Sequence, residues 1–382
     1  MKNNLTRRKK RLIRERTLHR IREARRISRL DVIYDPDKVS LEHRPHVNRK
    51  FRKVEPTRGR KVLSFPRKMD FRENLEVTLN FFSDLSNELL YGAHSEVYLE
   101  HKDLEKITPE AAIILFAELQ RCKAYKATAK RIRGNYPGNS DVANILTNIG
   151  FYSSLNIRPP PNASREISRS FFKVIPGNKT DARTANRLIK HFEKVVTFDP
   201  IARKRLIASL IECMDNVHNH AYRKDKGSPE LVGEWWMAGF NDMAVGQVAF
   251  IFFDQGVGVP TTLRERWAIK IRQLIGKNDG ELIGHAVLKG ITRRNSERHG
   301  NGFPSFKEFI NEIPDEAGGF LRVISNHGDY SYCKHSRSKP AMNSQPLSGS
   351  LMIWSIQPEK ETMGQDGRID LSVEGQQTRL TL

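Results

Sequence analysis

Apolar residues in the first patterned part of the chain alternate between short runs and a helical spacing. The clearest helical segment is Pro109–Tyr125, and Thr108 before it is a residue type that commonly caps helices. The other predicted elements are strands at Leu75–Phe82, Glu96–Leu99 and Ala129–Gly134 and a helix at Val142–Gly150. Three prolines, Pro159–Pro161, then break the chain. The pattern predicts a small α/β domain over residues 71–158.

After the prolines, the pattern predicts helices first and strands later. The predicted helices are Ala182–Val195, Ile201–Tyr222 and Ser305–Ile310, and the predicted strands are Phe171–Ile175, Gly233–Phe240, Gln247–Asp254, Leu321–Ser325, Tyr330–Cys333 and Ser350–Ile356. This order favours one mostly antiparallel sheet that is backed by helices on one face. A long irregular stretch is expected before the Ser305 helix, and a loose polar tail over residues 358–382.

Charge is concentrated at the N-terminus. The 382-residue chain has a formal net charge of +21, but residues 1–70 hold 24 Lys and Arg against 8 Asp and Glu, a net +16. The other residues are nearly balanced at +5. We predict a basic arm over residues 1–70, which is either a solubilising segment or a binding segment. Through residues 1–60 it would bind nucleic acid or an acidic protein, and an anionic membrane surface is a further alternative.

Cysteine usage and hydropathy restrict the class of protein. The three cysteines lie far apart and match neither a disulfide framework nor a zinc-site spacing. No apolar run is long enough to span a bilayer, and no apolar segment follows the basic N-terminus as in a signal peptide. We expect a cytoplasmic protein without a transmembrane segment.

The predicted helix Ile201–Tyr222 contains two polar residues that could take part in catalysis or metal binding. Glu212 and Asn216 are four residues apart, so they share one stripe of the helix. A carboxylate in this position can act as general base toward a water or hydroxyl that attacks a phosphate. An amide oxygen one turn away suits Mg²⁺, which prefers hard oxygen ligands. Taken alone, the pair is also compatible with an ordinary polar helix face.

Glycines follow one predicted strand and precede one predicted helix. The strand that ends at Asp254 continues as Gln255-Gly256-Val257-Gly258, which suits a carboxylate that contacts a base edge above a tight backbone turn. Gly300-Asn301-Gly302 precedes the Ser305–Ile310 helix, and free N–H groups at a helix N-terminus attract phosphates. Either glycine pair alone indicates only a turn.

In this order, these segments resemble the GHKL family of gyrase, Hsp90, histidine kinase and MutL ATPases. "ECMDNVHNHA" is similar to the N-box of the family, "DQGVG" and "HGNGF" to its glycine boxes, and "SGSLMIWSI" to its closing segment, with Ser350 where threonine is usual. The resemblance covers about residues 166–357 and implies an α/β sandwich fold, a mobile lid over the nucleotide, and ATP and Mg²⁺ as ligands. It implies Glu212 as catalytic base, Asn216 as magnesium ligand and Asp254 as acceptor of the adenine amino group. The residues that would shape the pocket are Gly256, Gly258, Gly300, Asn301, Gly302 and Ser350.

Residues 259–299 lie between the two glycine boxes, where the resemblance implies the lid, and their length is consistent with a functional loop. The segment ends in Arg293, Arg294, Arg298 and His299, and cations here can neutralise charge on a γ-phosphate. Arg298 is the nearest of these arginines to the second glycine box, although a solvated basic loop is an equally good interpretation of any one of them. His220 follows Asn216 by four residues and is also placed to reach phosphate.

The order of elements in residues 71–158 resembles a STAS domain. Where such domains have a phosphorylatable serine, this chain has Lys106-Ile107-Thr108-Pro109, without the usual Asp-Ser pair. Thr108 is favoured as a helix cap over a phosphoacceptor. The STAS-like domain is expected to engage a protein partner.

Three functions follow from this resemblance as expectations. The first is an ATP-binding and ATP-hydrolysing switch protein, in which the nucleotide alters how the STAS-like domain and the arm engage partners. The second is a serine/threonine protein kinase of the anti-sigma-factor type, whose N-box is the most similar in the family. The third is a nucleic-acid-binding module for which ATP is only a ligand.

Overall fold

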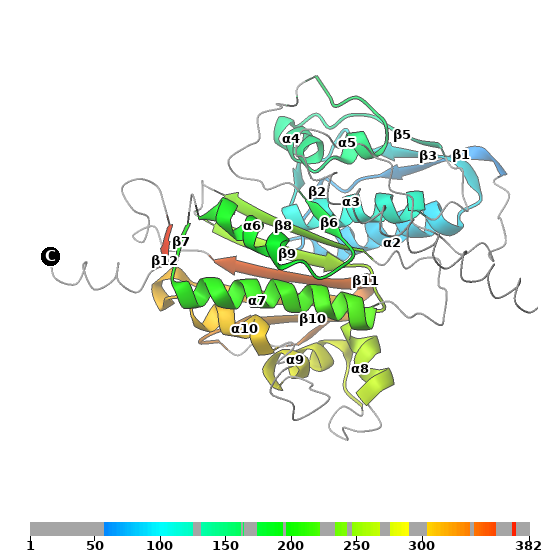
Figure 1. Cartoon of the computed structure of the whole chain (residues 1–382). Coiled ribbons are helices and arrows are strands. Elements are labelled where there is room, and N and C mark those ends of the chain that lie inside the picture. The colour runs from blue at the N-terminus through cyan, green and yellow to red at the C-terminus, as the bar shows by residue number, and fades with distance from the viewer. Residues whose placement is uncertain are drawn as a thin grey trace, which may run out of the picture. The chain divides into compact units, whose positions relative to one another are not determined.

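A computed structural model of the chain describes residues 57–124, 131–161, 163, 174–193, 196–221, 234–242, 247–267, 276–289, 304–336, 340–356 and 369–371. The chain divides into two compact units, residues 1–45 and 46–382, and all described residues belong to the second. They form a mixed α/β fold (Figure 1). Among them, no helix combines the length and the apolar character needed to cross a membrane.

The N-terminal part of the described chain is built on a three-stranded parallel sheet in the order β1-β3-β5. Its strands are β1 (Thr57–Ser64), β3 (His94–Glu100) and β5 (Arg131–Gly134), and a short parallel pair joins β2 (Lys68–Met69) to β4 (Lys106–Ile107). Its helices are α2 (Leu75–Tyr91), α3 (Pro109–Ala124), α4 (Ser140–Asn148) and α5 (Phe151–Ser154). The predicted strand at Glu96–Leu99 and the predicted helix from Pro109 are confirmed.

The strand predicted at Leu75–Phe82 is wrong, because these residues form the first half of helix α2. Two adjacent phenylalanines favour a strand locally. The buried side chains of Leu79, Phe82, Leu85 and Leu89, however, follow one another at spacings of three and four residues, which is the period of a helix. Over the 17 residues of α2 this period outweighs the local preference.

Strand β1 makes the basic arm shorter than predicted. Residues 57–70 contain β1 and β2. Strand β1 pairs in parallel with β3 as far as Ser64, and Leu63 and Phe65 are buried in the core. The arm is therefore confined to residues 1–56, which lie outside the described residues and hold 19 Lys and Arg against 7 Asp and Glu.

The C-terminal part contains a five-stranded sheet in the order β10-β11-β9-β8-β6, and every neighbouring pair is antiparallel. Its strands are β6 (Ile175–Gly177), β8 (Trp235–Asp242), β9 (Gln247–Asp254), β10 (Gly319–Cys333) and β11 (Ala341–Ile356). The predicted antiparallel sheet is confirmed. Strand β10 is continuous where two strands were expected, and its register against β11 shifts on both sides of Asn326.

Helices cover both faces of this sheet, whereas the sequence predicts helices on one face. Helices α6 (Ala182–Phe192), α7 (Pro200–Asn216) and α10 (Pro304–Asn311) lie on one face, and α2 and α3 lie on the other (Figure 1). Phe250 and Phe252 of β9 pack in the core beneath α6 and α7. Ile251 and Phe253, which point the opposite way, pack with α2 and α3. The two predicted domains therefore share a hydrophobic core.

The stretch expected to be irregular between the glycine boxes contains two helices, α8 (Val259–Trp267) and α9 (Asp279–Lys289). Helix α9 has buried residues at helical spacing, but Gly280 and Gly284 lower its helix propensity. Gly284 is required for packing, because a Cβ atom there would lie 2.7 Å from the ring of Tyr330 on β10. The segment is therefore not an irregular loop throughout.

The C-terminal tail also contains regular structure. Strand β12 (Ile369–Leu371) pairs in parallel with β7 (Val196–Phe198), which directly precedes α7. The loose tail expected over residues 358–382 is therefore wrong at these three positions. The predicted boundary at residue 357 separates two segments that belong to the same described unit.

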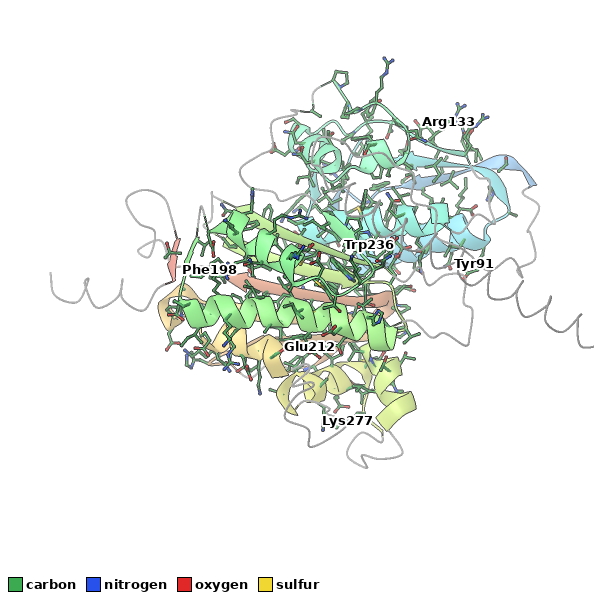
Figure 2. The ribbon with its side chains drawn as sticks, viewed as in Figure 1. Tyr91, Arg133, Phe198, Glu212, Trp236 and Lys277 are labelled. Atoms are coloured by element: carbon green, nitrogen blue, oxygen red, sulfur yellow. The ribbon has the colours of Figure 1, made fainter. Side chains whose placement is uncertain are left out.

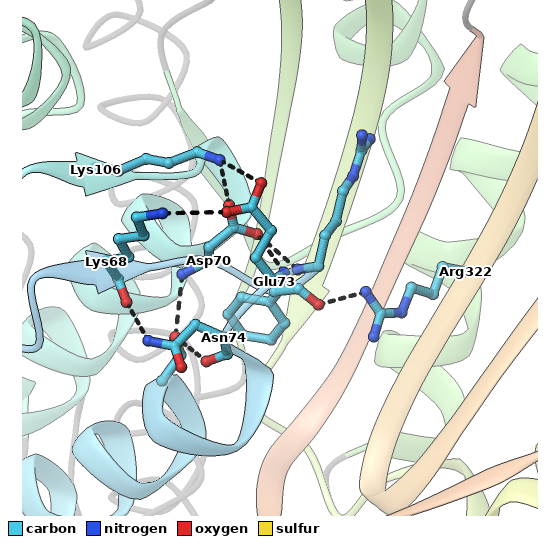
Figure 3. Close-up of polar contacts among 9 residues, drawn as sticks. Lys68, Asp70, Glu73, Asn74, Lys106 and Arg322 are labelled. Carbon is cyan, nitrogen blue, oxygen red and sulfur yellow. Dashed lines mark hydrogen bonds and ion pairs between the residues drawn. The ribbon is translucent and has the colours of Figure 1, made fainter.

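Polar contacts join the two parts of the fold at the start of α2 (Figure 3). Arg322 Nη1 of β10 donates a hydrogen bond to the backbone oxygen of Phe71 over 2.5 Å. Asp70, next to it, accepts hydrogen bonds from two backbone N–H groups of the following turn, and Lys106 Nζ lies 2.6 Å from its Oδ2. The start of α2 is thereby held by Arg322 of β10 and by Lys106 of β4.

Thr108 stands at the start of α3 but does not cap it. Its Oγ1 is buried and has no hydrogen-bond partner within the described segments. Only its backbone is used, since its N–H group donates to Met69 O and its carbonyl accepts from Ala112 N, both at 2.9 Å. A buried hydroxyl is not accessible to a phosphate donor, so this conformation does not support Thr108 as a phosphoacceptor either.

Candidate functional site

Helix α7 positions the two polar residues expected to act on a phosphate. Asp199 caps it, because its Oδ1 accepts hydrogen bonds from two backbone N–H groups of the first turn at 2.7 and 3.2 Å. Pro200 follows in the first turn, where its missing N–H group is not needed. After Asn216 the chain continues as a wider π-helical turn over Val217–Ala221, and such turns are frequent at functional sites.

Glu212 is half-buried on α7 (Figure 2). Burial raises the pKa of its carboxyl group, and the neighbouring carboxylate of Asp215 raises it further. Within the described part of the chain, Glu212 forms no hydrogen bond or ion pair. A carboxylate with a raised pKa and no partner among the described residues is suited to accept a proton from a ligand or a water molecule.

Asn216 has an unsatisfied side-chain amide. Its Nδ2 is buried and has no hydrogen-bond partner among the described residues. Leaving such a group unpaired costs about 1–3 kcal/mol, so a buried orphan amide calls for a ligand or an ion as its partner. An Asn side chain offers an oxygen to a cation and N–H groups to a ligand oxygen. The unpaired Nδ2 is therefore available to donate to a ligand oxygen, and the predicted role of the side-chain oxygen as a magnesium ligand stays a prediction.

Asp254 ends strand β9 as a buried carboxylate, with 4% of the residue exposed. Its Oδ1 accepts the Gly256 N–H at 2.8 Å, and the Ser350 side chain also forms a hydrogen bond with it. Burial raises the pKa of Asp254 to about 7, against the lowering effect of these two hydrogen bonds. Ser350 is the register partner of Asp254 on β11, so the structure brings these two predicted residues together.

Two residues that sequence reasoning missed complete this arrangement. Ser325 of β10 donates a hydrogen bond to Gly349 O at 2.7 Å, and its Oγ lies 3.1 Å from Ser350 Oγ. Gly349 has a positive φ of 101°, and a Cβ atom there would lie 1.8 Å from Asp254 O. Glycine is therefore required beside Asp254. The only signal in the sequence is its place beside Ser350 in "SGSL".

The loop Gly256–Gly258 contacts the π-helical turn that follows α7. A Cβ atom on Gly256 would lie 2.7 Å from Ala221 O, so only glycine allows the loop to approach the π-helical turn this closely. Val257 N donates to the same Ala221 oxygen at 3.0 Å. Gly258 has φ of 88°, a left-handed conformation in which other residues are strained. These contacts bring the segments "ECMDNVHNHA" and "DQGVG" together.

The second glycine box and the lid arginines fall outside the described residues. They are Arg293, Arg294, Arg298, His299, Gly300, Asn301 and Gly302. The helix that follows them, α10, does pack on α7, where Ser209 Oγ donates to Ser305 O at 3.0 Å. The side chain of His220 also lies outside the described residues, so its predicted reach toward a phosphate stays a prediction.

Comparisons with known proteins do not assign the chain to a family. No protein-family model matches it, and no curated protein matches it. The interpretation of the site therefore depends on its geometry and on the resemblance of its short segments.

Asp254→Asn is expected to stabilise the protein at pH 8 but not at pH 4. The pKa of the carboxyl rises from 3.8 to about 7 on folding, so between these values unfolding releases a proton. Stability is therefore lost as the pH rises from about 4 to about 7, by a few kcal/mol in order of magnitude. Asparagine keeps the acceptor for the Gly256 N–H group and is never charged.

Thermal unfolding of both proteins at the two pH values tests this expectation. The difference in Tm between variant and parent should increase with pH. An equal loss of Tm at pH 4 and pH 8 would show that the Asp254 carboxyl has no raised pKa in the folded state.

Proposed function

We propose that residues 166–357 bind ATP with Mg²⁺ and hydrolyse it, and that the nucleotide controls how the N-terminal parts of the chain engage a partner. The observation that carries the proposal is the surrounding of Asp254. A buried carboxylate stands at the end of an apolar strand, opposite Ser350, and the glycine loop after it contacts the π-helical turn that follows α7. A buried acceptor of this kind is suited to the exocyclic amino group of adenine.

Two polar residues of α7 support the proposed binding of Mg²⁺ and the hydrolysis of the phosphate. Among the described residues, the buried Asn216 Nδ2 has no partner and would donate to the ligand, while the oxygen of the same amide would hold Mg²⁺. The bound ion would supply charge neutralisation to the phosphates. Glu212 lies one helical turn before Asn216, and its raised pKa brings it closer to the neutral range in which a general base is most effective. In the proposed reaction the Glu212 carboxylate takes the proton of the water that attacks the γ-phosphate.

The shared core supports the switch. The sheet that carries Asp254 packs directly on α2 and α3 of the STAS-like part. A change at the end of β9 therefore reaches residues of that part without a flexible linker between them. We propose that the STAS-like part and the basic arm form the output of the switch toward a protein or a nucleic acid.

Incubation with [γ-³²P]ATP and Mg²⁺ tests the proposal and separates it from a protein kinase. The switch predicts release of labelled inorganic phosphate and no label on protein. Label transferred to this chain or to a co-purified protein would instead identify the kinase of the anti-sigma-factor type. A protein that retains all label as ATP, although it binds the nucleotide, would contradict hydrolysis.

Asn216→Ala is expected to abolish the magnesium dependence of ATP binding. Alanine removes the oxygen that would hold the ion, and it also removes the unpaired amide, so the fold should be retained. Titration of ATP with and without Mg²⁺ should show strengthening by the ion in the parent and none in the variant. Equal strengthening in both proteins would rule out Asn216 as the ligand.

A further inference from the structure

A buried polar cluster connects the first glycine box to helix α3. Gln255, between Asp254 and Gly256, is fully buried, and its Nε2 donates a hydrogen bond to Glu118 Oε1 of α3 at 2.9 Å. Glu118 is 3% exposed, and its other oxygen accepts the Ser86 hydroxyl of α2 at 2.8 Å and forms an ion pair with Arg121. One oxygen of the Glu118 carboxylate is thus held by residues of the STAS-like part, and the other accepts a hydrogen bond from the "DQGVG" loop.

Strand geometry explains why this loop faces two partners. Successive side chains along a strand point to opposite faces of a sheet. Along β9, Phe252 faces the α7 side and Phe253 faces the α2 and α3 side. Asp254 continues the first series, and Gln255 continues the second by its contact with Glu118. Adjacent residues of one loop therefore contact the proposed nucleotide site and the STAS-like part.

We propose that Glu118 is a positioning residue for the "DQGVG" loop and that it couples nucleotide binding to the docking of α3 on the sheet. The inference rests on the proposed function and names the contact through which the STAS-like part senses the nucleotide. Glu118 does not touch the ligand. It fixes Gln255, and Gln255 fixes the backbone on which Asp254 and Gly256 depend.

The cost of burying the cluster supports this role. A buried ion pair adds little stability over apolar side chains of the same size, but loss of one partner leaves a buried charge unpaired. A change at Gln255 therefore acts on a carboxylate that has few other partners among the described residues. Glu118 and Arg121 lie three residues apart on one helix, and Gln255 is the donor to Glu118 that comes from the other part of the fold.

Gln255→Met tests the coupling, because it removes the donor and keeps the volume of the side chain. With the loop released, only a fraction of molecules holds Asp254 in place, and we expect ATP affinity to fall about tenfold. Coupling is reciprocal, so ATP should slow amide exchange of residues 109–124 in the parent and have no effect on them in the variant.

Glu76→Met is the matched control, because it also removes one polar contact and keeps the length of the side chain. Glu76 of α2 accepts the backbone N–H group of Ser344 at 3.1 and 3.2 Å, so it also joins the two parts of the fold but lies outside the loop. This variant should bind ATP with parental affinity. The inference is overturned if the parent binds ATP and Gln255→Met binds it equally well, or if ATP leaves the exchange of residues 109–124 unchanged.

Amide exchange measured without ATP tests the positioning role of Glu118 even if the proposed function is wrong. A parent that binds no ATP at all would refute the proposed function. In that case Gln255→Met should still accelerate exchange in both residues 109–124 and residues 255–258, since each segment holds the other. Acceleration in only one of the two segments would overturn the positioning role.

Discussion

Glu212→Gln is expected to lower ATP hydrolysis by about 10²–10⁴-fold while ATP binding is retained. The amide fills the space of the carboxylate but cannot take a proton from the attacking water. Binding is expected to persist because the base acts on the water and not on the nucleotide. Release of phosphate and titration of ATP, measured on the same preparation, give the two quantities. Parental turnover in this variant would remove Glu212 from the mechanism.

Asp215→Asn tests whether the pKa of Glu212, the proposed general base, controls turnover. The Asp215 carboxylate raises the pKa of Glu212 and accepts a hydrogen bond from the Thr180 hydroxyl, which asparagine can still accept. Without the Asp215 charge, the pKa of Glu212 should fall, and Glu212 should remain ionised at lower pH. The acidic limb of the pH–rate profile should therefore move to lower pH, with turnover at pH 8 little changed. An unmoved limb would show that the limb does not report Glu212.

The basic arm is expected to make nucleic-acid binding depend steeply on salt. Residues 1–56 hold 19 Lys and Arg against 7 Asp and Glu. If about six of these charges meet phosphates, affinity should fall about a thousandfold between 50 and 200 mM salt, through counterion release. The arm contains few aromatic residues, so we expect backbone contacts and little sequence preference. Binding of RNA and DNA at several salt concentrations measures the slope.

Deletion of residues 1–56 is the control for the arm. Deletion of residues 1–60 would cut into strand β1, whereas the shorter deletion leaves β1 complete. The truncated protein should lose nucleic-acid binding and bind ATP with parental affinity. If the full chain binds neither RNA nor DNA at 50 mM salt, the arm has a protein partner or a solubilising role instead.

The elements that the sequence predicts well are those whose signals are local. Helix α7 combines a cap, a proline in the first turn and a helical spacing of apolar residues, and all three lie within one segment. Strand β9 is a continuous apolar run bounded by polar residues. Such a run also indicates burial on both faces, but it does not say which residues cover the second face. The packing of α2 and α3 on that face appears only in the structure.

The contacts that the sequence misses join residues far apart in the chain. Gln255 and Glu118 are 137 residues apart, and neither belongs to a pattern that would pair them. Leu75–Phe82 resembles a strand because its window is shorter than the helix that contains it. Position 349 requires glycine because its backbone lies close to Asp254 O on the paired strand β9. This contact depends on the register of β9 and β11, which the composition of the two strands does not reveal.

Calorimetric titration of the full chain with ATP and Mg²⁺ tests the central proposal most directly, with Asp254→Asn as the paired variant. We predict saturable binding of one ATP per chain, little binding of GTP, and an affinity about ten- to a hundredfold lower in the variant, because a mismatched buried polar contact costs about 1–3 kcal/mol. The variant should remain folded, since it is expected to be at least as stable as the parent. Absence of ATP binding in the parent, or equal affinity in a folded Asp254→Asn protein, would contradict the proposal.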